Sequence, residues 1–555
     1  MSKIKYINIF LLIALLGLLL LSVLFRYNSL DSHFSHVDDL IVPRVFNSIN
    51  SSNEFIQKVN TKVELNEVSQ NIIKVLYPVL KPLLFAVSVS GSSTYAPIQF
   101  VFSSFLLDEH YSYKDTLFWS RIPSFIAFII SLFLFFYVVR GINKKESKTS
   151  ILFGITILAS SWQFCIYSMQ SQSYAIGVMA VFILFITFIR LINDDKLSNL
   201  KAFNYGIILS ILMFTQYQIL FFLPAFFIIS GIIKFEQLKK ILIIFFIQVF
   251  SFIVLYTLFL KNLVGNGLNW NVGVNKEFLF ELPDGFLNIV NYSLDFFINN
   301  SYITFKSLVI FMNSSINTVV TIFFIILFFI GLFSFAKSSL VLKKSFFYFT
   351  VISFLTWISL IMMQKLTLSP TRHSLILIGF IALYVFFGFN HLLGYIRQIQ
   401  LKRFFILALS VFVSFSFSFN YQKVFTHRVD KFDEKEIKSI INKHNINTIY
   451  NYNWTWNLVF MPSIMKDFEI VNSNRNIYLK KKENKDEKNI MIITHRNRLN
   501  KESIKDILRS IDINNYKDYF IKYKKEDFSD TQISISDLTK NGTNSLAIYI
   551  LGVDK

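Results

Sequence analysis

Two adjacent carboxylates, Asp38 and Asp39, are the side chains of this sequence best placed to do chemistry. They follow an apolar run, residues 7–25, that is nearly long enough to cross a membrane as a helix. A carboxylate pair beside a membrane costs solvation free energy unless it has a task or a counter-charge. Adjacent side chains point in different directions, so one can act while the other orients it or is spare. We therefore expect a functional pair, with a solvated helix cap as the alternative.

A metal site is a second interpretation of the same segment. His33, His36 and Asp38 follow the pattern H-x-x-H-x-D, in which two histidines can share a helix face and a carboxylate can complete the ligand set. An ordinary surface histidine is commoner than a ligand, and no other histidine-rich or acidic cluster is predicted on the same side of the membrane. We therefore predict that no metal is required and keep a divalent cation at these residues as the alternative.

Cationic side chains at the ends of apolar runs form a third group. Arg121 and Arg372 each lie close to a proline at the predicted outer end of a span, where a guanidinium group can hold a phosphate. Contact with lipid head groups is the alternative, and we prefer it for Lys81 and Lys365. The cations expected on the side of the carboxylate pair are Arg44, Lys81, Arg121, Lys365, Arg372 and His373.

A polar octapeptide, YSMQSQSY at residues 167–174, separates two apolar runs. It predicts a polar hairpin tip at the outer membrane surface and contains Gln170, Gln172 and Tyr174. The sequence has no glycine-rich phosphate loop, Walker sequence or nucleophile elbow. These absences argue against an ATP-driven transporter and against a serine hydrolase.

The elements that must position these residues are membrane helices. Of the 555 residues, 53% are hydrophobic and only 16% are charged, and the mean hydropathy is +0.49, which is typical of an integral membrane protein. The net charge of +20 is spread over short clusters between apolar runs, as in cytoplasmic loops, and not over one patch for nucleic acid. The single cysteine, Cys165, excludes an internal disulfide.

Apolar runs of about twenty residues cross a bilayer as helices. We predict about eleven of them, at residues 7–25, 121–139, 151–168, 174–191, 204–217, 219–233, 241–260, 316–335, 346–363, 374–393 and 404–420. The first run lacks a small-x-small cleavage site, so we expect it to be retained as a helix. The polar residues 215–218 divide the fifth span from the sixth.

Basic loops orient this array of spans. Residues 140–148, 234–240, 337–344 and 397–403 are rich in Lys and Arg, and all fall on the side of the Lys-rich N-terminus. The positive-inside rule then predicts a multi-pass protein of the cytoplasmic (inner) membrane with a cytoplasmic N-terminus. The first outer loop covers residues 26–120, of which 43–107 are expected to form amphipathic or re-entrant helices at the outer surface.

The last part of the chain differs in kind. A helical pattern, DEKEIKSIINKH, is followed by strand-like runs such as NTIYNY, KNIMIIT and SLAIYIL. This alternation predicts a small α/β domain. We therefore predict an all-α polytopic membrane domain at residues 1–420 and an extracytoplasmic α/β domain at residues 421–555.

The motifs and their order resemble the GT-C fold glycosyltransferases that use polyprenyl-phosphate sugars, a superfamily with protein mannosyltransferases and bacterial lipid A sugar transferases. In HVDDL, Asp38 matches the acidic residue of the family and Asp39 replaces its glutamate. The sequence YAPIQ at 95–99 retains Pro97 of the family's His-Pro-Pro-Leu-Tyr segment. Arg121, followed by Pro and Ser, matches the start of the family's second span.

Two further matches extend this resemblance to about residues 5–400. YSMQSQSY is similar to the family's Tyr-Ser-x-Glu-x-Arg-x-Tyr, except that Gln170 and Gln172 replace both charged residues. Arg372 resembles a late outer arginine of the family. The residues that the resemblance assigns to substrate binding are Arg44, Tyr95, Pro97, Arg121, Gln170, Gln172, Tyr174, Arg372 and His373.

The resemblance implies a membrane enzyme of the bacterial cell envelope. It would transfer a sugar from a polyprenyl-phosphate donor to a glycan, lipid or protein acceptor at the outer face, with inversion and with Asp38 as general base. Arg121 and Arg372 would stabilise the leaving phosphate, so that no cofactor is required. The alternatives are a lipid-linked-sugar transporter or flippase and a non-catalytic envelope assembly protein.

Overall fold

The computed structural model describes most of the helical part of the chain and the strands of its C-terminal part. The described residues are 2–30, 71, 81–82, 96–107, 111, 113–257, 280, 286–309, 315–363, 366, 368, 372–425, 434–451, 468–472, 477–481, 490–495, 519–525 and 546–553. They fall into two compact units. The first takes its residues from Met1–Asn28, Val79–Phe105 and Arg121–Asn420, and the second from Ser29–Pro78, Leu106–Ser120 and Tyr421–Lys555.

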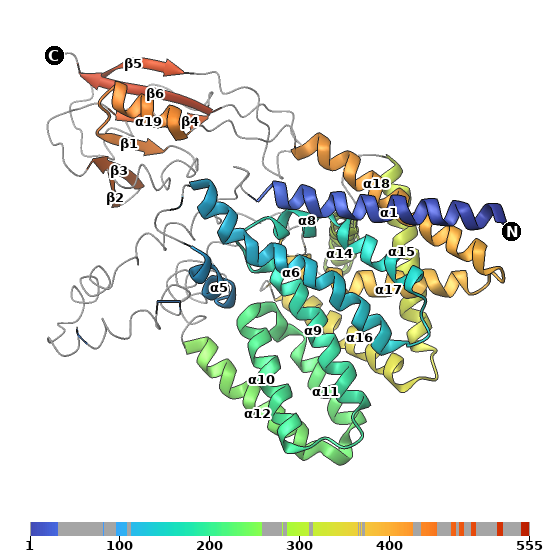
Figure 1. Ribbon diagram of the computed structural model, residues 1–555. Coiled ribbons are helices and arrows are strands. Elements are labelled where there is room, and N and C mark those ends of the chain that lie inside the picture. The colour runs from blue at the N-terminus through green and yellow to red at the C-terminus, as the bar shows by residue number, and fades with distance from the viewer. Residues whose placement is uncertain are drawn as a thin grey trace. The chain divides into compact units, whose positions relative to one another are not determined.

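The first unit is built from helices, most of which begin and end near the limits of the apolar runs (Figure 1). Three short 3-10 turns accompany them, η2 (Tyr217–Phe221), η3 (Phe235–Gln237) and η6 (Arg372–Leu377). The helices are α1 (Ser2–Asn28), α5 (Ile98–Leu106), α6 (Tyr113–Ile142), α7 (Lys148–Ala159), α8 (Trp162–Ser168), α9 (Tyr174–Asn193), α10 (Asn199–Thr215), α11 (Leu223–Ile233), α12 (Leu238–Leu255), α14 (Phe286–Val309), α15 (Ser315–Ala336), α16 (Val341–Met362), α17 (Ile378–Leu393) and α18 (Ile399–Phe425).

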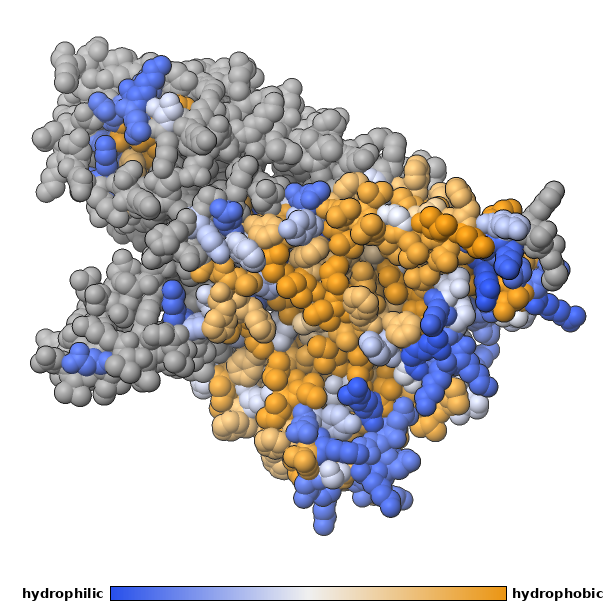
Figure 2. Space-filling model, in the orientation of Figure 1, coloured by the Kyte–Doolittle hydropathy of each residue, from blue (hydrophilic) through white to orange (hydrophobic). Residues whose placement is uncertain are grey.

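The length and composition of these helices confirm a polytopic helical membrane protein. Within the described residues, eight helices are long and apolar enough to cross a membrane. Apolar side chains cover the visible face of this unit, with hydrophilic residues gathered at its ends (Figure 2). The spans at Tyr174–Asn193 and Ser374–Leu393 are 78% and 83% buried, against 17% for Ile4–Asn28. Helices α9 and α17 therefore form the centre of the unit, and α1 lies at its margin.

Three of the predicted spans depart from straight transmembrane helices. The predicted span 151–168 is a bent pair, α7 and α8, with an angle of 67° between the two helices. The predicted spans 204–217 and 219–233 form α10 and α11. With 17 residues α10 is at the lower limit for a bilayer crossing, and α11, with 11 residues, is too short to cross a bilayer. The polar break predicted at residues 215–218 is confirmed, because α10 ends at Thr215 and η2 begins at Tyr217.

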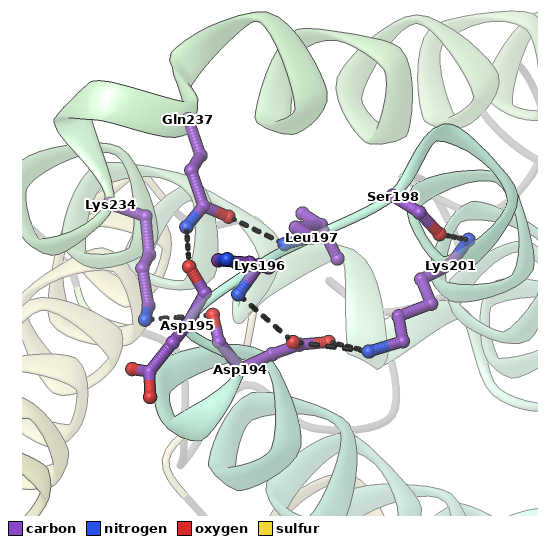
Figure 3. A network of polar contacts seen from close by, with 8 residues as sticks. All are labelled: Asp194, Asp195, Lys196, Leu197, Ser198, Lys201, Lys234 and Gln237. Carbon is purple, nitrogen blue, oxygen red and sulfur yellow. Dashed lines mark hydrogen bonds and ion pairs between the residues drawn. The ribbon is translucent and has the colours of Figure 1, made fainter.

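Polar contacts join the loops that were predicted to share one side of the membrane. Lys234 Nζ donates to the carbonyl of Asp194 at 3.0 Å, and Gln237 Nε2 donates to the carbonyl of Asp195 at 2.6 Å (Figure 3). In the same way, Asn390 Nδ2 at the end of α17 donates to Glu146 in the loop after α6 at 2.9 Å. These contacts support the predicted grouping of the basic loops, while the assignment of that side to the cytoplasm remains a prediction.

Helices also appear in the segments predicted to lie outside. Helix α5 belongs to the segment 43–107, for which amphipathic or re-entrant helices were predicted, and its nine residues are too few to cross a membrane. Helix α14 has 24 residues and lies between the predicted spans 241–260 and 316–335, where no span was predicted. It contacts α8, α15, α17 and η6, so it is an integral part of the first unit.

The second unit contains a six-stranded mixed sheet with the order β2-β3-β1-β4-β6-β5. Strands β1 and β4 pair in parallel, and the other neighbours pair antiparallel. Helix α19 (Glu434–Lys443) precedes the sheet and is followed by Asn445 in the left-handed region (φ 46°), as is common just beyond helix C-termini. The strands are β1 (Thr448–Asn451), β2 (Phe468–Asn472), β3 (Ile477–Lys481), β4 (Ile490–His495), β5 (Tyr519–Lys525) and β6 (Leu546–Val553).

The predicted helix and the strand-like runs of the C-terminal part are therefore confirmed as α19, β1, β4 and β6. The core beside them contains the buried side chains of Ile440, Ile441, Ile449 and Ile490. The boundary at residues 420 and 421, and the extracytoplasmic location of this domain, remain predictions.

Candidate functional site

A cluster of buried polar side chains lies at one end of the first unit. It comes from the start of α5, the start of α6, the bend between α7 and α8, the turn between α8 and α9, and the start of η2. A membrane interior has no water to pair with such groups, so their burial needs internal partners or a ligand. The members that are less than one-tenth exposed include Gln99, Ser124, Gln163, Ser168, Gln170, Ser171, Gln172, Ser173, Gln216 and Gln218.

The turn between α8 and α9 is not the surface tip that was predicted. Gln170 is 2% exposed and Gln172 is 0% exposed, because other elements pack over the turn. Ser124 Oγ of α6 donates to the carbonyl of Gln172 at 3.0 Å. Ser173 Oγ donates to Gln216 Oε1, just after α10, at 3.2 Å. The octapeptide therefore lies inside the unit.

Ser124 connects three of the sequence motifs. Its hydroxyl accepts a hydrogen bond from Gln99 Nε2 at 3.2 Å while it donates to the carbonyl of Gln172. Gln99 stands in the first turn of α5, where the carbonyl of Pro97 accepts hydrogen bonds from the backbone amides of Phe100 and Val101. The structure therefore brings the segments around Pro97, Ser124 and Gln172 together, as a common site requires.

Arg121 belongs to the same cluster. It precedes Ser124 by three residues on α6, so both side chains share one helix face. Its side chain is fully buried. An arginine buried in a membrane helix is a functional candidate, because its charge is costly away from water. Tyr174, the first residue of α9, is also buried and its ring lies 5.5 Å from that of Tyr167.

Several amide atoms of the cluster have no hydrogen-bond partner within the described part of the chain. They are both side-chain atoms of Gln172 and the Oε1 atoms of Gln99, Gln163 and Gln170. A buried polar atom without a partner costs about 1–3 kcal/mol. Within the described residues the cluster therefore offers one donor and four acceptors without a partner, and a ligand with hydroxyl groups could pair with them.

The turn η6 brings a further segment to this end of the unit. It begins at Arg372 and contacts α8, α9 and α14, two of which bound the buried polar turn. Ser374 in η6 is fully buried. The turn that begins with Arg372 and His373 therefore lies beside two helices that bound the cluster, and the roles of these two residues stay predictions.

Sequence reasoning missed Arg26, which it assigned to the first residue of an outer loop. Arg26 lies in the last turn of α1 and is fully buried. Its Nη2 donates to the carbonyl of Ala159 at 2.7 Å and its Nε to Ser168 Oγ at 3.2 Å. Its guanidinium group lies 4.2 Å from the ring centroid of Phe128. The sequence did contain one indication of this role, because a positive charge in the last turn of an apolar helix marks a functional candidate.

The contacts of Arg26 explain how the bend between α7 and α8 is held. Helix α7 ends at Ala159, and a helix end leaves carbonyl groups without intrahelical partners. The carbonyl of Ala159 accepts from Arg26 and from Ser22 Oγ at 3.2 Å. Because Arg26 also donates to Ser168 at the end of α8, it connects both α7 and α8 to α1. This contact lies where the buried polar turn begins.

Replacement of Arg26 by methionine is expected to lower the free energy of unfolding by about 3 kcal/mol or more, since hydrogen bonds to charged groups contribute roughly 1.5–3 kcal/mol each. Arg26→Lys should also be less stable than the wild type, because an ammonium group cannot reproduce the planar array of N–H donors of a guanidinium group. Thermal unfolding of the purified protein in detergent measures both. Arg190→Met, at an exposed arginine in the last turn of α9, is the matched control. Equal losses in Arg26→Met and Arg190→Met would contradict this role.

Several of the predicted site residues lie outside the described residues. They are Asp38, Asp39, Arg44, Tyr95, His33 and His36. Among the described residues, no group of three or more His, Cys, Asp or Glu side chains is arranged to hold a metal ion. The predictions about the carboxylate pair and about the metal therefore stay predictions.

Comparison with known proteins adds a structural likeness. The chain matches no protein-family model and no curated protein. A solved structure, ArnT from Cupriavidus metallidurans in the apo state, aligns over 82% of this chain and 87% of that chain, with 7% sequence identity and a TM-score of 0.42. At this identity and TM-score, the likeness does not assign the chain to a family.

Proposed function

We propose that this chain is an integral membrane glycosyltransferase that moves a sugar from a polyprenyl-phosphate donor to a glycan, lipid or protein acceptor. The observation that supports it is the buried cluster of amide and hydroxyl groups, with Arg121, at one end of the spans. Neutral hydrogen-bonding groups suit the hydroxyls of a sugar, and a guanidinium group suits a phosphate. The resemblance of the sequence motifs to the GT-C glycosyltransferases supports the same reaction.

The amide groups of Gln170 and Gln172 would recognise the sugar. An amide offers both donors and acceptors, as does a sugar hydroxyl, and the free atoms of these two residues are buried. The two glutamines stand where the related motif carries a glutamate and an arginine. We therefore propose a neutral sugar, because a charged one would be left without a counter-charge at these positions.

The charged side chains would act in the reaction itself. Asp38 would take the proton of the acceptor hydroxyl while Asp39 orients it, and attack on the anomeric carbon would invert its configuration. Arg121 and Arg372 would stabilise the leaving phosphate, and Arg44 and His373 would bind the donor. The donor is already activated as a lipid phosphate, so the proposed reaction requires no cofactor. The reaction would take place at the outer face of the cytoplasmic membrane, on the side of the extracytoplasmic domain.

A lipid-linked-sugar transporter or an envelope assembly protein would use the same membrane architecture without transferring a sugar. Mass spectrometry of cell-envelope glycans, with and without this protein, separates these classes when it is combined with a transfer assay. We expect one glycan modification to disappear and the purified protein to restore it from a polyprenyl-phosphate sugar. Loss of the modification without any transfer by the purified protein would favour the alternatives.

The variant Gln172→Leu is expected to lose activity without losing stability. Leucine has a similar volume and removes two buried atoms that have no hydrogen-bond partner among the described residues, so the melting temperature should stay the same or rise. Transfer should fall about tenfold or more, because the amide would no longer pair with the sugar. The two measurements are thermal unfolding of the purified variant and glycan analysis of cells that express it.

Gln248→Leu is the matched control, because Gln248 is also buried and, unlike Gln172, donates two hydrogen bonds through its amide nitrogen. Gln248 Nε2 donates to the carbonyl of Gly206 at 2.6 Å and to Ser210 Oγ at 3.1 Å, between α10 and α12. This variant should melt at a lower temperature and keep its transfer per folded molecule. If Gln172→Leu keeps full activity, the polar turn does not bind the sugar.

A further inference from the structure

A second polar site lies at the end of the first unit where the basic loops gather. A cavity of about 740 Å³ opens between α15, α16, α17 and the loop after α6. Its polar lining consists of Glu146, Ser334, Lys337, Lys343, Asn390 and His391. None of these residues belongs to the buried polar cluster around Gln172, so this cavity has no role in the proposed transfer.

The positive charges of the cavity are available to a ligand. The Nζ atom of Lys343 lies 5.6 Å and 5.5 Å from the ring centroids of Phe335 and Phe387. Within the described part of the chain, neither Lys343 nor Lys337 forms an ion pair. A cation–π contact leaves the ammonium protons free on the side away from the rings. An anion in the cavity could therefore meet two ammonium groups.

The one carboxylate of the cavity is held in its wall. Glu146 accepts hydrogen bonds from Asn143 Nδ2 at 2.7 Å and from Asn390 Nδ2 at 2.9 Å, one on each oxygen. These bonds fix Glu146 to the loop and to the end of α17. The two lysines and the one glutamate together give a net charge of +1, which favours an anionic ligand.

The remaining lining is apolar. Ile330, Phe333 and Phe387 form this part of the wall, and Phe333 is 58% exposed on the outside of α15, a helix long and apolar enough to cross the membrane. A small hydrophilic anion would gain no binding free energy from contact with these apolar side chains. A lipid whose phosphate lies among the charges and whose acyl chains follow α15 would use both kinds of surface.

We propose that this cavity binds the phosphate head group of an anionic phospholipid. The basic loops around it would attract anionic lipids to this end of the protein, and Lys337 and Lys343 would hold the phosphate by charge-assisted hydrogen bonds. The bound lipid would link α15, α16 and α17 where they meet the membrane surface.

Native mass spectrometry of the full-length purified protein tests this site, with phosphatidylglycerol and phosphatidylcholine of equal chain length in competition. Wild-type protein should retain phosphatidylglycerol preferentially. Lys337→Gln with Lys343→Gln should weaken its retention about tenfold or more, since two charge-assisted hydrogen bonds are lost. Lys343→Arg keeps the charge and the ring contact, so it should retain the lipid.

The matched control is Lys145→Gln with Lys344→Gln. These lysines are exposed, lie in the neighbouring loop and helix, and do not line the cavity, so the double variant has the same net charge as the test variant. It should keep the preference for phosphatidylglycerol. Equal weakening in both double variants, or equal retention of the two lipids by the wild type, would overturn the proposal. Displacement of phosphatidylglycerol by excess inorganic phosphate would assign the cavity to a water-soluble phosphate instead and would overturn it as well.

Discussion

Asp38→Asn is expected to reduce sugar transfer by roughly two to four powers of ten, the contribution typical of general base catalysis. Asparagine keeps the shape and hydrogen-bonding reach of aspartate but does not accept a proton at neutral pH. The loss should fall on turnover and not on donor binding, because the base acts in the transition state. Transfer by the purified variant, with donor binding measured separately, gives the two quantities.

Two further variants make the result specific. Asp39→Asn should retain most of the activity if Asp38 alone accepts the proton. Arg372→Ala should weaken donor binding and turnover together, because the phosphate is charged before and after transfer. If Asp39→Asn abolishes transfer and Asp38→Asn does not, the roles of the two carboxylates are exchanged. If neither variant loses activity, the chain is not a glycosyltransferase of this kind.

Gly388→Ala is expected to cost roughly 3 kcal/mol of stability, the upper end of the usual cost of overpacking. Helices α15 and α17 touch through their backbones at this point. A Cβ atom on Gly388 would lie 1.9 Å from the carbonyl oxygen of Leu327, and one on Gly331 would lie 2.0 Å from that of Tyr384. Backbone atoms cannot rotate away as a side chain can, so the two helices would have to separate. Small residues serve this close approach in membrane helices.

Thermal unfolding of the purified protein in detergent measures this effect. Gly17→Ala in α1 is the matched control, because no atom lies within 4 Å of the Cβ position there. It should be neutral or slightly stabilising, since alanine favours a helix by roughly 0.5–1 kcal/mol over glycine. A Gly388→Ala protein that unfolds at the wild-type temperature would show that α15 and α17 can separate without cost.

The local properties of the chain were readable from its sequence. Most of the apolar runs became helices near the predicted limits, and the polar residues 215–218 became the boundary after α10. The strand-like runs of the last part became β1, β4 and β6. Helix and strand patterns depend on neighbouring residues, and the length of a span depends on bilayer thickness, so both can be read in short windows of sequence.

Non-local contacts decided the candidate site. The octapeptide at 167–174 has the composition of an exposed turn, yet Ser124 and Gln216 enclose it, from α6 and from the end of α10. Non-local contacts also decided the place of α14. Its sequence is rich in polar residues and does not indicate a membrane helix, yet α14 packs against the apolar helices of the first unit.

Residue patterns therefore predict the membrane class, most of the helices, the grouping of the basic loops and the motifs around Pro97, Arg121 and Gln172. Helix packing, in contrast, shows that these motifs meet, that Arg26 joins α1 to the bend after Ala159, and that α15 and α17 touch at Gly388. A hydrogen bond or a close approach between distant segments depends on how the helices pack. Packing is set by the fit of many side chains at once and not by any short stretch of sequence.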